Sequence, residues 1–278
     1  MNRRNLLRLA AAIVVAAFPL GVKAETSPLL VGVAPHTSAR IILEMYQPLR
    51  ERLQADLGQP VEIVTAPDFT EFVRRALGQE YDIAITTGHQ ARLLQVDGGY
   101  QPLVTYGAVF RSVVVVKKDS KAAGPRDFSG TTIIGLSPTS LVTQWGERWL
   151  KTGSAQGLQV RYVSAADSVA QLILAGDASA GLMSLANFMG LAPDVRDRLR
   201  LLVQSEAQLG RVYMLNSRLG GRREAILKAL AAFTASPAGQ QYFAAYRLEG
   251  YRGVKQAELE AMEPFTQGVR DELNATRR

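Results

Sequence analysis

The sequence predicts an α/β fold of two lobes, each a mostly parallel sheet flanked by helices, with a cleft between them. Short apolar runs alternate with amphipathic segments over most of the 278 residues, which is the pattern of repeated β/α units. The apolar runs are continuous, as in strands that are covered on both faces. A polar loop at 118–125 separates two such series, and the length suffices for two lobes of about 100–150 residues each.

The first series contains three strands and three helices. A helix is expected from about Ala39, because apolar residues recur on one face until Gly58, a residue typical of helix ends. Asp68 is placed to cap the next, shorter helix. The strands are expected at 29–34, 61–65 and 81–86. The helices are expected at about 39–57, at 69–76 and, after a polar turn at 87–89, from there to about residue 96.

The second series continues the pattern and ends in a helical tail. Two further strands, 102–106 and 111–117, are expected before the polar loop. After it the expected strands are 131–136, 159–163, 180–184, 199–203 and 211–216, and the expected helices are 140–151, 167–175, 225–235, 238–246 and 256–273. From this order we expect lobe 1 to comprise residues 25–110 and 210–278, and lobe 2 to comprise residues 111–209. Strands near 107–115 and 204–212 would cross between the lobes.

Residues 1–24 have the composition of an export signal. Basic residues cluster at 3–8, an apolar stretch covers 6–20, and small residues precede Glu25. The apolar stretch is shorter than the ~20 residues that span a bilayer, so we expect cleavage near Ala24 and a periplasmic location. The arginine pair also resembles a twin-arginine signal, which leaves two export routes open.

The chain without this segment carries a mild net charge. The segment holds four basic residues and no acidic residue, so its removal lowers the net charge from +7 to +3. A charge this small and scattered does not favour nucleic acid as a partner. No second long apolar segment follows, so we expect a soluble protein outside the cytoplasm, and a monomer.

Enzyme and metal signatures are scarce. The chain contains no cysteine, which excludes disulfides, thiolate metal sites and a cysteine nucleophile. It lacks the P-loop, the dinucleotide-binding glycine pattern, the nucleophile elbow and the zinc-protease motif. Its two histidines, His36 and His89, do not have the spacing of a zinc site. We therefore expect no catalytic residue, no metal and no cofactor, with an exported enzyme on the same fold as the alternative.

Polar turns follow the carboxyl ends of several predicted strands, which is the edge where open α/β sheets bind ligands. The turns are 35–38, 86–89, 137–140, 184–187 and 205–210. A site that uses turns from both series would lie between the lobes. The candidate ligand-binding residues are Pro35, His36, Thr37, Thr86, Thr87, His89, Phe110, Arg111, Thr139, Ser140, Thr143 and Ser184.

Ser140 has two interpretations. It stands at the N-cap of a predicted helix, where a hydroxyl and free amides could receive an anion or a polar ligand head. It could equally do no more than cap the helix. Arg111 is similarly suited to a bidentate carboxylate or phosphate contact, or is a solvated arginine at a strand start. Each histidine either donates a hydrogen bond to a ligand or is an exposed turn residue.

Several stretches, taken in order, resemble one family. They are Val31-Gly-Val-Ala-Pro35, residues 46–49 and 57–62, Tyr81-Asp-Ile-Ala84, residues 111–120, Phe128-Ser-Gly130, Gly176-Asp-Ala178 and residues 236–240. Together they resemble the phosphate/phosphite/phosphonate-binding family of periplasmic receptors for ABC transporters, over residues 28–273. The resemblance implies a type II periplasmic binding protein, whose two lobes are joined by two crossing segments and close over a solute.

The resemblance also implies an oxyanion site at the start of the helix near Ser140, where the family usually has an S-x-S-G pattern. Here Ser140-Leu-Val-Thr143 occupies that place, and only Ser140 matches. The family's Gly-Pro and nearby tyrosine correspond to Thr-Gly-His-Gln-Ala at 87–91. These departures predict weak or no binding of phosphate and simple phosphonates. The implied partners are a small-molecule ligand and either a membrane permease or a sensor kinase.

Overall fold

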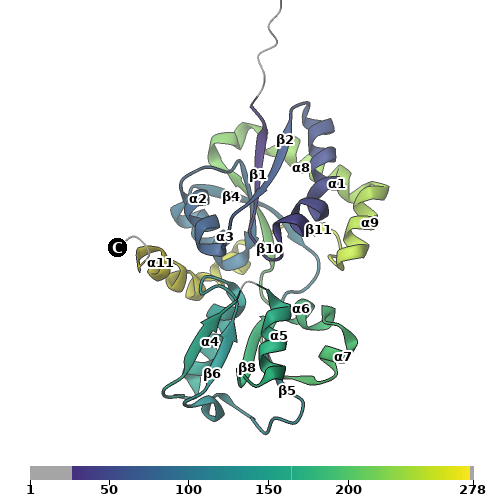
Figure 1. The fold of residues 1–278 in the computed structure, drawn as a ribbon. Coiled ribbons are helices and arrows are strands. Elements are labelled where there is room, and N and C mark those ends of the chain that lie inside the picture. Colours follow the sequence, from purple (N-terminus) through teal and green to yellow (C-terminus); the bar gives the residue numbers. More distant parts are fainter. Residues whose placement is uncertain (1–26, 164, 276–278) are drawn as a thin grey trace, which may run out of the picture.

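The computed structural model describes residues 27–163 and 165–275, and it contains two sheets with helices on their faces (Figure 1). A six-stranded sheet forms lobe 1, in the order β11-β4-β10-β3-β1-β2. A five-stranded sheet forms lobe 2, in the order β7-β6-β8-β5-β9. The predicted α/β class with two lobes is therefore confirmed, while the predicted export signal at 1–24 lies outside the described residues.

Lobe 1 takes its elements from both ends of the chain. Its strands are β1 (Leu29–Val33), β2 (Val61–Thr65), β3 (Ile83–Thr87), β4 (Tyr100–Tyr106), β10 (Arg211–Asn216) and β11 (Tyr251–Arg252). Its helices are α1 (Ala39–Leu57), α2 (Phe69–Leu77), α3 (Gly88–Asp97), α8 (Arg223–Ala235), α9 (Pro237–Tyr246), α10 (Gln256–Glu260) and α11 (Thr266–Ala275). The 3-10 turns η2 (Ser217–Arg222) and η3 (Glu263–Phe265) connect some of them.

Lobe 2 is formed by the middle of the chain. Its strands are β5 (Ser112–Lys117), β6 (Thr132–Gly135), β7 (Gln159–Tyr162), β8 (Ala180–Ser184) and β9 (Leu199–Gln204). Its helices are α4 (Leu141–Thr152), α5 (Ala166–Ala175), α6 (Leu185–Gly190) and α7 (Pro193–Arg196), with the 3-10 turn η1 (Pro125–Phe128).

Both sheets are mixed, whereas the sequence suggested mostly parallel ones. β1 pairs in parallel with β2 and β3, and β6 pairs in parallel with β7 and β8. β10 is antiparallel to β3 and β4, and β5 is antiparallel to β8 and β9. The chain crosses between the lobes before β5 and again before β10, so each of these strands starts at the junction where the parallel strands end. The carboxyl ends of the parallel strands in both lobes consequently face the junction.

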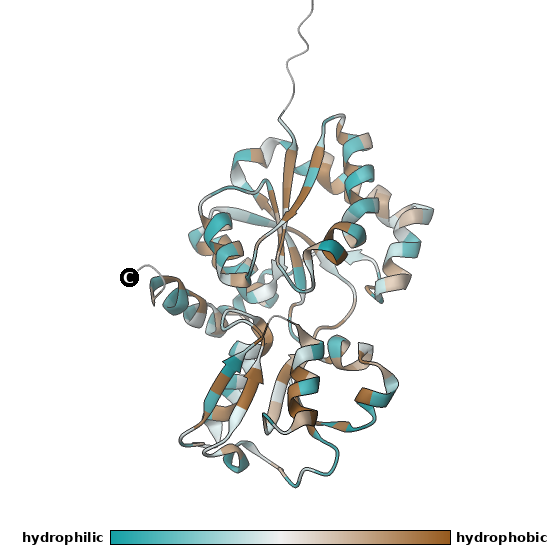
Figure 2. Cartoon of the chain, viewed as in Figure 1, coloured by the Kyte–Doolittle hydropathy of each residue, from teal (hydrophilic) through white to brown (hydrophobic). Residues whose placement is uncertain are grey.

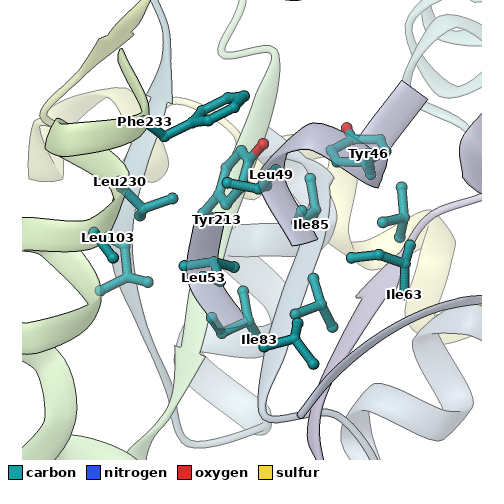
Figure 3. Close-up of a cluster of buried hydrophobic side chains, with 14 of the residues drawn as sticks. Tyr46, Leu49, Leu53, Ile63, Ile83, Ile85, Leu103, Tyr213, Leu230 and Phe233 are labelled. Carbon is teal, nitrogen blue, oxygen red and sulfur yellow. The ribbon is translucent and has the colours of Figure 1, made fainter. Parts of the chain in front are cut away.

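The first apolar cluster of lobe 1 lies between the sheet and α1, α8 and α9 (Figure 3). Helix α1 begins at the N-cap Ser38 and ends at Gly58, whose φ of 64° is the left-handed conformation that glycine adopts without strain. Its inward face is fully apolar apart from one tyrosine hydroxyl. The residues that it buries are Ile42, Met45, Tyr46, Leu49 and Leu53.

The second apolar cluster covers the other face of this sheet, under α2, α3, α10 and α11. Asp68 caps α2 as predicted, because its Oδ1 accepts a hydrogen bond from the Glu71 amide at 2.8 Å. Leu141, the first residue of α4 in lobe 2, is buried in the same cluster. The start of α4 is therefore packed directly against lobe 1, and Figure 1 shows α11 beside this junction.

The lobe 2 sheet also separates two apolar clusters, one under α5 and one under α4. The four valines of β5 are fully buried because they point alternately into these two clusters. Figure 2 shows the same division in both lobes, with hydrophobic strands inside and hydrophilic residues on the outer helix faces.

Some predicted elements differ from the observed ones. Helix α3 starts at Gly88, so His89 lies in its first turn and not in a preceding loop. The single tail helix predicted over 256–273 is wrong, since Pro264 and the 3-10 turn η3 divide it into α10 and α11. Helices α6 and α7 and the two-residue strand β11 had no strong periodic signal.

Candidate functional site

A cleft of about 940 Å³ lies between the two lobes at the carboxyl ends of their strands. Lobe 1 lines it with the turn after β1 and with the segment that leads from β2 into α2. Lobe 2 lines it with the turn after β6 and with residues that follow β7. A solute in this cleft would touch both lobes, which is the arrangement that a closing two-lobed receptor needs.

The charged groups in the cleft lining offset one another. Arg75 Nε donates to Glu71 Oε1 at 2.8 Å, and Arg74 also donates to the Glu71 carboxylate. The hydrogen bonds from Arg75 and Arg74 lower the pKa of Glu71. Asp68 and Glu272 also line the cleft. Three carboxylates thus face two guanidinium groups, and the lining shows no excess of positive charge.

The hydroxyls of Thr139, Ser140 and Thr143 at the start of α4 are not part of the cleft lining. Ser140 is 3% exposed, and its Oγ accepts from the Thr143 amide at 3.4 Å and donates to Thr143 Oγ1 at 2.9 Å. It therefore caps α4. Thr139 and Thr143 are fully buried, and Leu141 and Val142 are buried as well. The start of α4, which was predicted as an oxyanion site, is therefore covered by its own side chains and by residues of lobe 1.

Lobe 1 holds this turn through hydrogen bonds to the Thr139 carbonyl. His89 Nε2 lies 2.9 Å from that oxygen and Gln90 Nε2 lies 3.1 Å from it. A carbonyl only accepts, so His89 carries its proton on Nε2, and Nδ1 accepts from Thr87 Oγ1 at 3.1 Å. Burial lowers the pKa of His89 to about 4. A neutral histidine thus forms part of the contact between the lobes.

His36 lies between two cleft-lining residues, Pro35 and Thr37, but its ring is directed at protein atoms. Its Nδ1 donates to the Ala34 carbonyl at 2.9 Å, so Nε2 is the acceptor for Arg211 Nη1 at 2.8 Å. Burial, and then the charge of Arg211, lower the pKa of His36 to about 3. His36 is therefore a neutral acceptor that orients Arg211.

Arg211, the first residue of β10, is surrounded by tyrosines. Its Nη1 donates to Tyr46 Oη at 3.2 Å, and its guanidinium lies 5.4 Å from the ring centre of Tyr106. Burial disfavours the guanidinium charge, but the neighbouring tyrosine oxygens outweigh it and raise the pKa of Arg211. The hydroxyl of Tyr106 continues the network to Tyr213 at 2.8 Å and to Tyr242 at 2.6 Å.

The remaining candidates have partners within the protein. Arg111 Nη1 donates to the Ser205 carbonyl at 2.7 Å, and Phe110 forms a β-bridge with Gln208. Thr86 Oγ1 donates to the side chain of Gln90. Ser184 Oγ accepts from the Asn187 amide at 3.1 Å and caps α6.

The structure thus brings only part of the predicted set to the cleft. Pro35 and Thr37 line it, His36 lies directly behind them, and the turn at 137–140 contributes Ser137 and Pro138. The ligand-binding roles of the twelve candidates stay predictions. The predicted set did not include the turn after β2, although this turn also follows the end of a parallel strand and could have been found by the same rule. It did not include Arg211 either, because only the fold brings that residue to His36.

Two lobes joined by two crossing segments, with a cleft at their facing strand ends, define a solute-binding protein of the type II periplasmic class. The chain belongs to the family of periplasmic substrate-binding proteins of phosphonate ABC transporters, whose family model matches residues 31–259. The predicted family and the solute-binding role are thereby confirmed. The family is periplasmic, and its members act with a small-molecule ligand and a membrane permease.

Solved structures with the same fold carry different ligands. A Xanthomonas citri protein, XAC2383, bound to chloride is 18% identical with a TM-score of 0.75, over 89% of this chain and 100% of that one. PhnD1 of Prochlorococcus marinus in complex with methylphosphonate is 13% identical with a TM-score of 0.76, over 87% and 98%. An ancestral arginine-binding protein bound to arginine is 14% identical with a TM-score of 0.60, over 80% and 99%. At these identities the likeness shows the fold alone.

A comparison with curated proteins finds no matching sequence. Within residues 27–163 and 165–275, no helix is both long and apolar enough to cross a bilayer. The same residues contain no group of three or more histidine and acidic side chains that could hold a metal ion.

Proposed function

We propose that the chain captures a small organic solute in the cleft between its lobes and presents it to an ABC permease in the periplasm. The observation that carries this proposal is the cleft of about 940 Å³, which both lobes line at their strand ends. Its volume lies within the range of about 300–1,000 Å³ that small-molecule sites occupy. A solute that touches both lobes stabilises their closed arrangement by its extra affinity for that state.

The proposal includes a division of the chain into lobe 1 (25–110 and 210–278) and lobe 2 (111–209). The strand content supports it, because the strands of the six-stranded sheet lie within 29–106 and 211–252, and those of the five-stranded sheet within 112–204. We also propose cleavage near Ala24, a monomeric mature protein and no catalytic activity. Delivery to a permease is favoured over signalling through a sensor kinase because the family is one of transporter components.

The ligand proposed here is neither phosphate nor a simple phosphonate. Ser140 is the one residue that matches the family's oxyanion pattern, and its hydroxyl is hydrogen-bonded to Thr143 and caps α4. The methylphosphonate in PhnD1 is a property of that protein.

Mass spectrometry of solutes that co-purify with the exported protein, followed by calorimetric titration of the solute found, tests the proposal. Thr37→Trp should fill the cleft and lower the affinity at least tenfold. Gln47→Trp, on the exposed face of the helix α1 that follows this turn, is the matched control and should leave the affinity unchanged. Recovery of no solute, or equal affinity in both variants, would contradict capture in this cleft.

A further inference from the structure

Arg211 is a part-buried cation without an anionic partner in the described chain. None of the ion pairs within residues 27–163 and 165–275 includes it. Its hydrogen-bond partners, His36 and Tyr46, are neutral groups. The tyrosine oxygens offset the cost of burying this charge, but no carboxylate of the described chain neutralises it, so it attracts an anion from outside the chain.

The guanidinium is held from one side only. Nη1 makes the contacts to His36 Nε2, Tyr46 Oη and, at 4.0 Å, Met45 Sδ. Nε and Nη2 make no hydrogen bond to any described residue. Within the described chain, the fully buried side-chain atoms without a hydrogen-bond partner are Tyr81 Oη and Arg223 Nη1. Nε and Nη2 of Arg211 are not among them, so these two atoms are in contact with solvent. One edge of the guanidinium is therefore fixed, and the edge formed by Nε and Nη2 is accessible.

The surroundings of this edge supply no negative charge at the pH of the periplasm. Burial, and then the charge of Arg211, lower the pKa of His36 to about 3, so its Nε2 stays an acceptor. Burial raises the pKa values of Tyr106, Tyr213 and Tyr242, so these phenols stay protonated. The hydroxyls of Tyr46 and Tyr213 lie on the same side of the apolar cluster (Figure 3), and both are hydrogen-bonded to the hydroxyl of Tyr106.

The position of Arg211 adjoins the cleft. His36, which accepts from Arg211, lies between Pro35 and Thr37, and these two residues line the cleft. Arg211 also begins the strand that follows the second crossing between the lobes. Arg211 is not itself among the lining residues, so a solute group has to extend past the β1 turn to reach the accessible edge.

We propose that Arg211 is the anion-binding residue of the solute site and that it receives a carboxylate of the solute on Nε and Nη2. This inference rests on the proposed solute-binding function and names the chemical class of the ligand. A guanidinium edge with two parallel N–H groups matches the two oxygens of a carboxylate. His36 and Tyr46 act as positioning residues that hold the other edge.

Charge matching favours a carboxylate over a phosphonate. Arg211 supplies one positive charge without a carboxylate partner, and the cleft lining adds no positive excess, because it contains three carboxylates (Asp68, Glu71 and Glu272) and two guanidinium groups. A carboxylate neutralises that single charge. A doubly charged phosphonate would keep a negative charge with no helix amide available for it, because the α4 start is buried.

The test uses the mature protein with sodium acetate, succinate and benzoate as probes. Methylphosphonate and inorganic phosphate are the comparison anions, and sodium chloride at matched ionic strength is the blank. Binding is measured by calorimetry and by the rise in the thermal unfolding midpoint, since a ligand of the folded state raises that midpoint. Arg211→Gln removes the charge, and Arg222→Gln is the matched control, because Arg222 also donates to a neutral partner, Gln59.

At least one carboxylate probe should bind the wild type and the Arg222→Gln variant with equal affinity. Its affinity for the Arg211→Gln variant should be at least tenfold lower. Arg211→Gln should fold with a lower thermal unfolding midpoint than the wild type in the absence of anions, because it loses the hydrogen bond to Tyr46 and the contact with the Tyr106 ring. Affinities are therefore compared at a temperature where both proteins are folded. Arg211→Lys should restore part of the binding, since it keeps the charge but not the fork.

Equal carboxylate binding by the wild type and Arg211→Gln would overturn the subsite and leave the proposed function standing. So would a preference for methylphosphonate over all three carboxylates, or co-purification of a neutral solute. A wild type that binds no probe and yields no co-purifying solute would contradict the proposed function itself. If Arg211→Gln does not fold, the comparison of Arg211→Lys with the wild type decides the matter, and equal affinity overturns the bidentate contact.

Discussion

At the scale of single residues, Ser140 shows how the same side chain can match a family pattern and serve a structural purpose. Its hydroxyl both accepts from the Thr143 amide and donates to Thr143 Oγ1, at 3.4 and 2.9 Å. The sequence left capping and ligand binding open for this residue. The burial of Ser140 and of its neighbours Thr139 and Thr143 favours capping.

Ser140→Ala should therefore lower the free energy of unfolding by about 1 kcal/mol, the usual contribution of an N-cap. The affinity for the co-purified solute should change less than twofold. Urea unfolding and calorimetry measure the two quantities separately. A tenfold loss of affinity at unchanged stability would show that the hydroxyl contacts the solute.

Gly32 in β1 is a second residue whose environment allows no side chain. A Cβ atom at this position would lie 2.5 Å from the ring of Tyr81, which is itself fully buried against Phe72. Gly32→Ala should lower the free energy of unfolding by about 1–3 kcal/mol, as overpacked cores do. Gly124→Ala is the control, because a Cβ there meets nothing within 4 Å. Equal denaturation midpoints of the two variants would contradict this packing.

At the scale of elements, the contact between α3 and the turn before α4 joins the lobes. His89 and Gln90 lie in the first turn of α3, and both approach one carbonyl of the other lobe. Thr70 of α2 adds a contact to Thr139 Oγ1 at 3.2 Å. These polar contacts are buried, so each is expected to weigh more than a surface hydrogen bond.

His89→Leu keeps a side chain of similar size and removes the donor to Thr139. The closed arrangement of the lobes should become less populated, so the radius of gyration from small-angle X-ray scattering should increase. Solute affinity should fall with the closed fraction. Gln95→Leu changes the same helix, where Gln95 is hydrogen-bonded to Arg92 and Gln256 of lobe 1, and it should change neither value. Identical scattering of the His89→Leu and Gln95→Leu variants would contradict a role of His89 in holding the lobes together.

Local signals predicted individual elements well. The apolar stripe and Gly58 placed α1 at its observed bounds, and β10 coincides with the predicted strand 211–216. The tail was predicted as one helix because its apolar spacing continues on both sides of Pro264. The direction of β5 and β10 could not be read from their own residues, since it depends on where the chain crosses between the lobes.

The site was less accessible to sequence reasoning than the fold. The strand-end rule located the turns at 35–38 and 137–140, parts of which line the cleft. It could not show that the α4 start is covered by α3, because that contact joins residues about fifty positions apart. Arg211 and His36 are 175 positions apart, and their pairing exists only in the folded protein.

At the scale of the whole molecule, two neutral histidines make stability depend on pH. The pKa of His36 falls to about 3 and that of His89 to about 4, against 6.5 in an unfolded chain. Between those values the unfolded state binds more protons, so stability is complete above pH 6.5 and is lost as the pH falls toward 4. The loss should be on the order of 2 kcal/mol for each histidine at about pH 5.

The thermal unfolding midpoint should accordingly fall between about pH 7 and about pH 5. His89→Gln removes one of the two titrating groups while keeping a donor for the Thr139 carbonyl, so its midpoint should depend less steeply on pH. Differential scanning calorimetry at constant ionic strength measures both slopes. Parallel slopes for the variant and the wild type would contradict a buried neutral His89.

The bonds that His89 and Gln90 make to Thr139 end on a main-chain oxygen, which every amino acid possesses. Substitutions at position 139 therefore leave those two acceptor contacts intact, whereas substitutions at either donor remove one. In descendants of this protein, the turn can diversify its side chains toward new solutes while the hold of one lobe on the other persists. Positions 89 and 90 of α3 should therefore tolerate fewer substitutions than the turn whose carbonyl they bind.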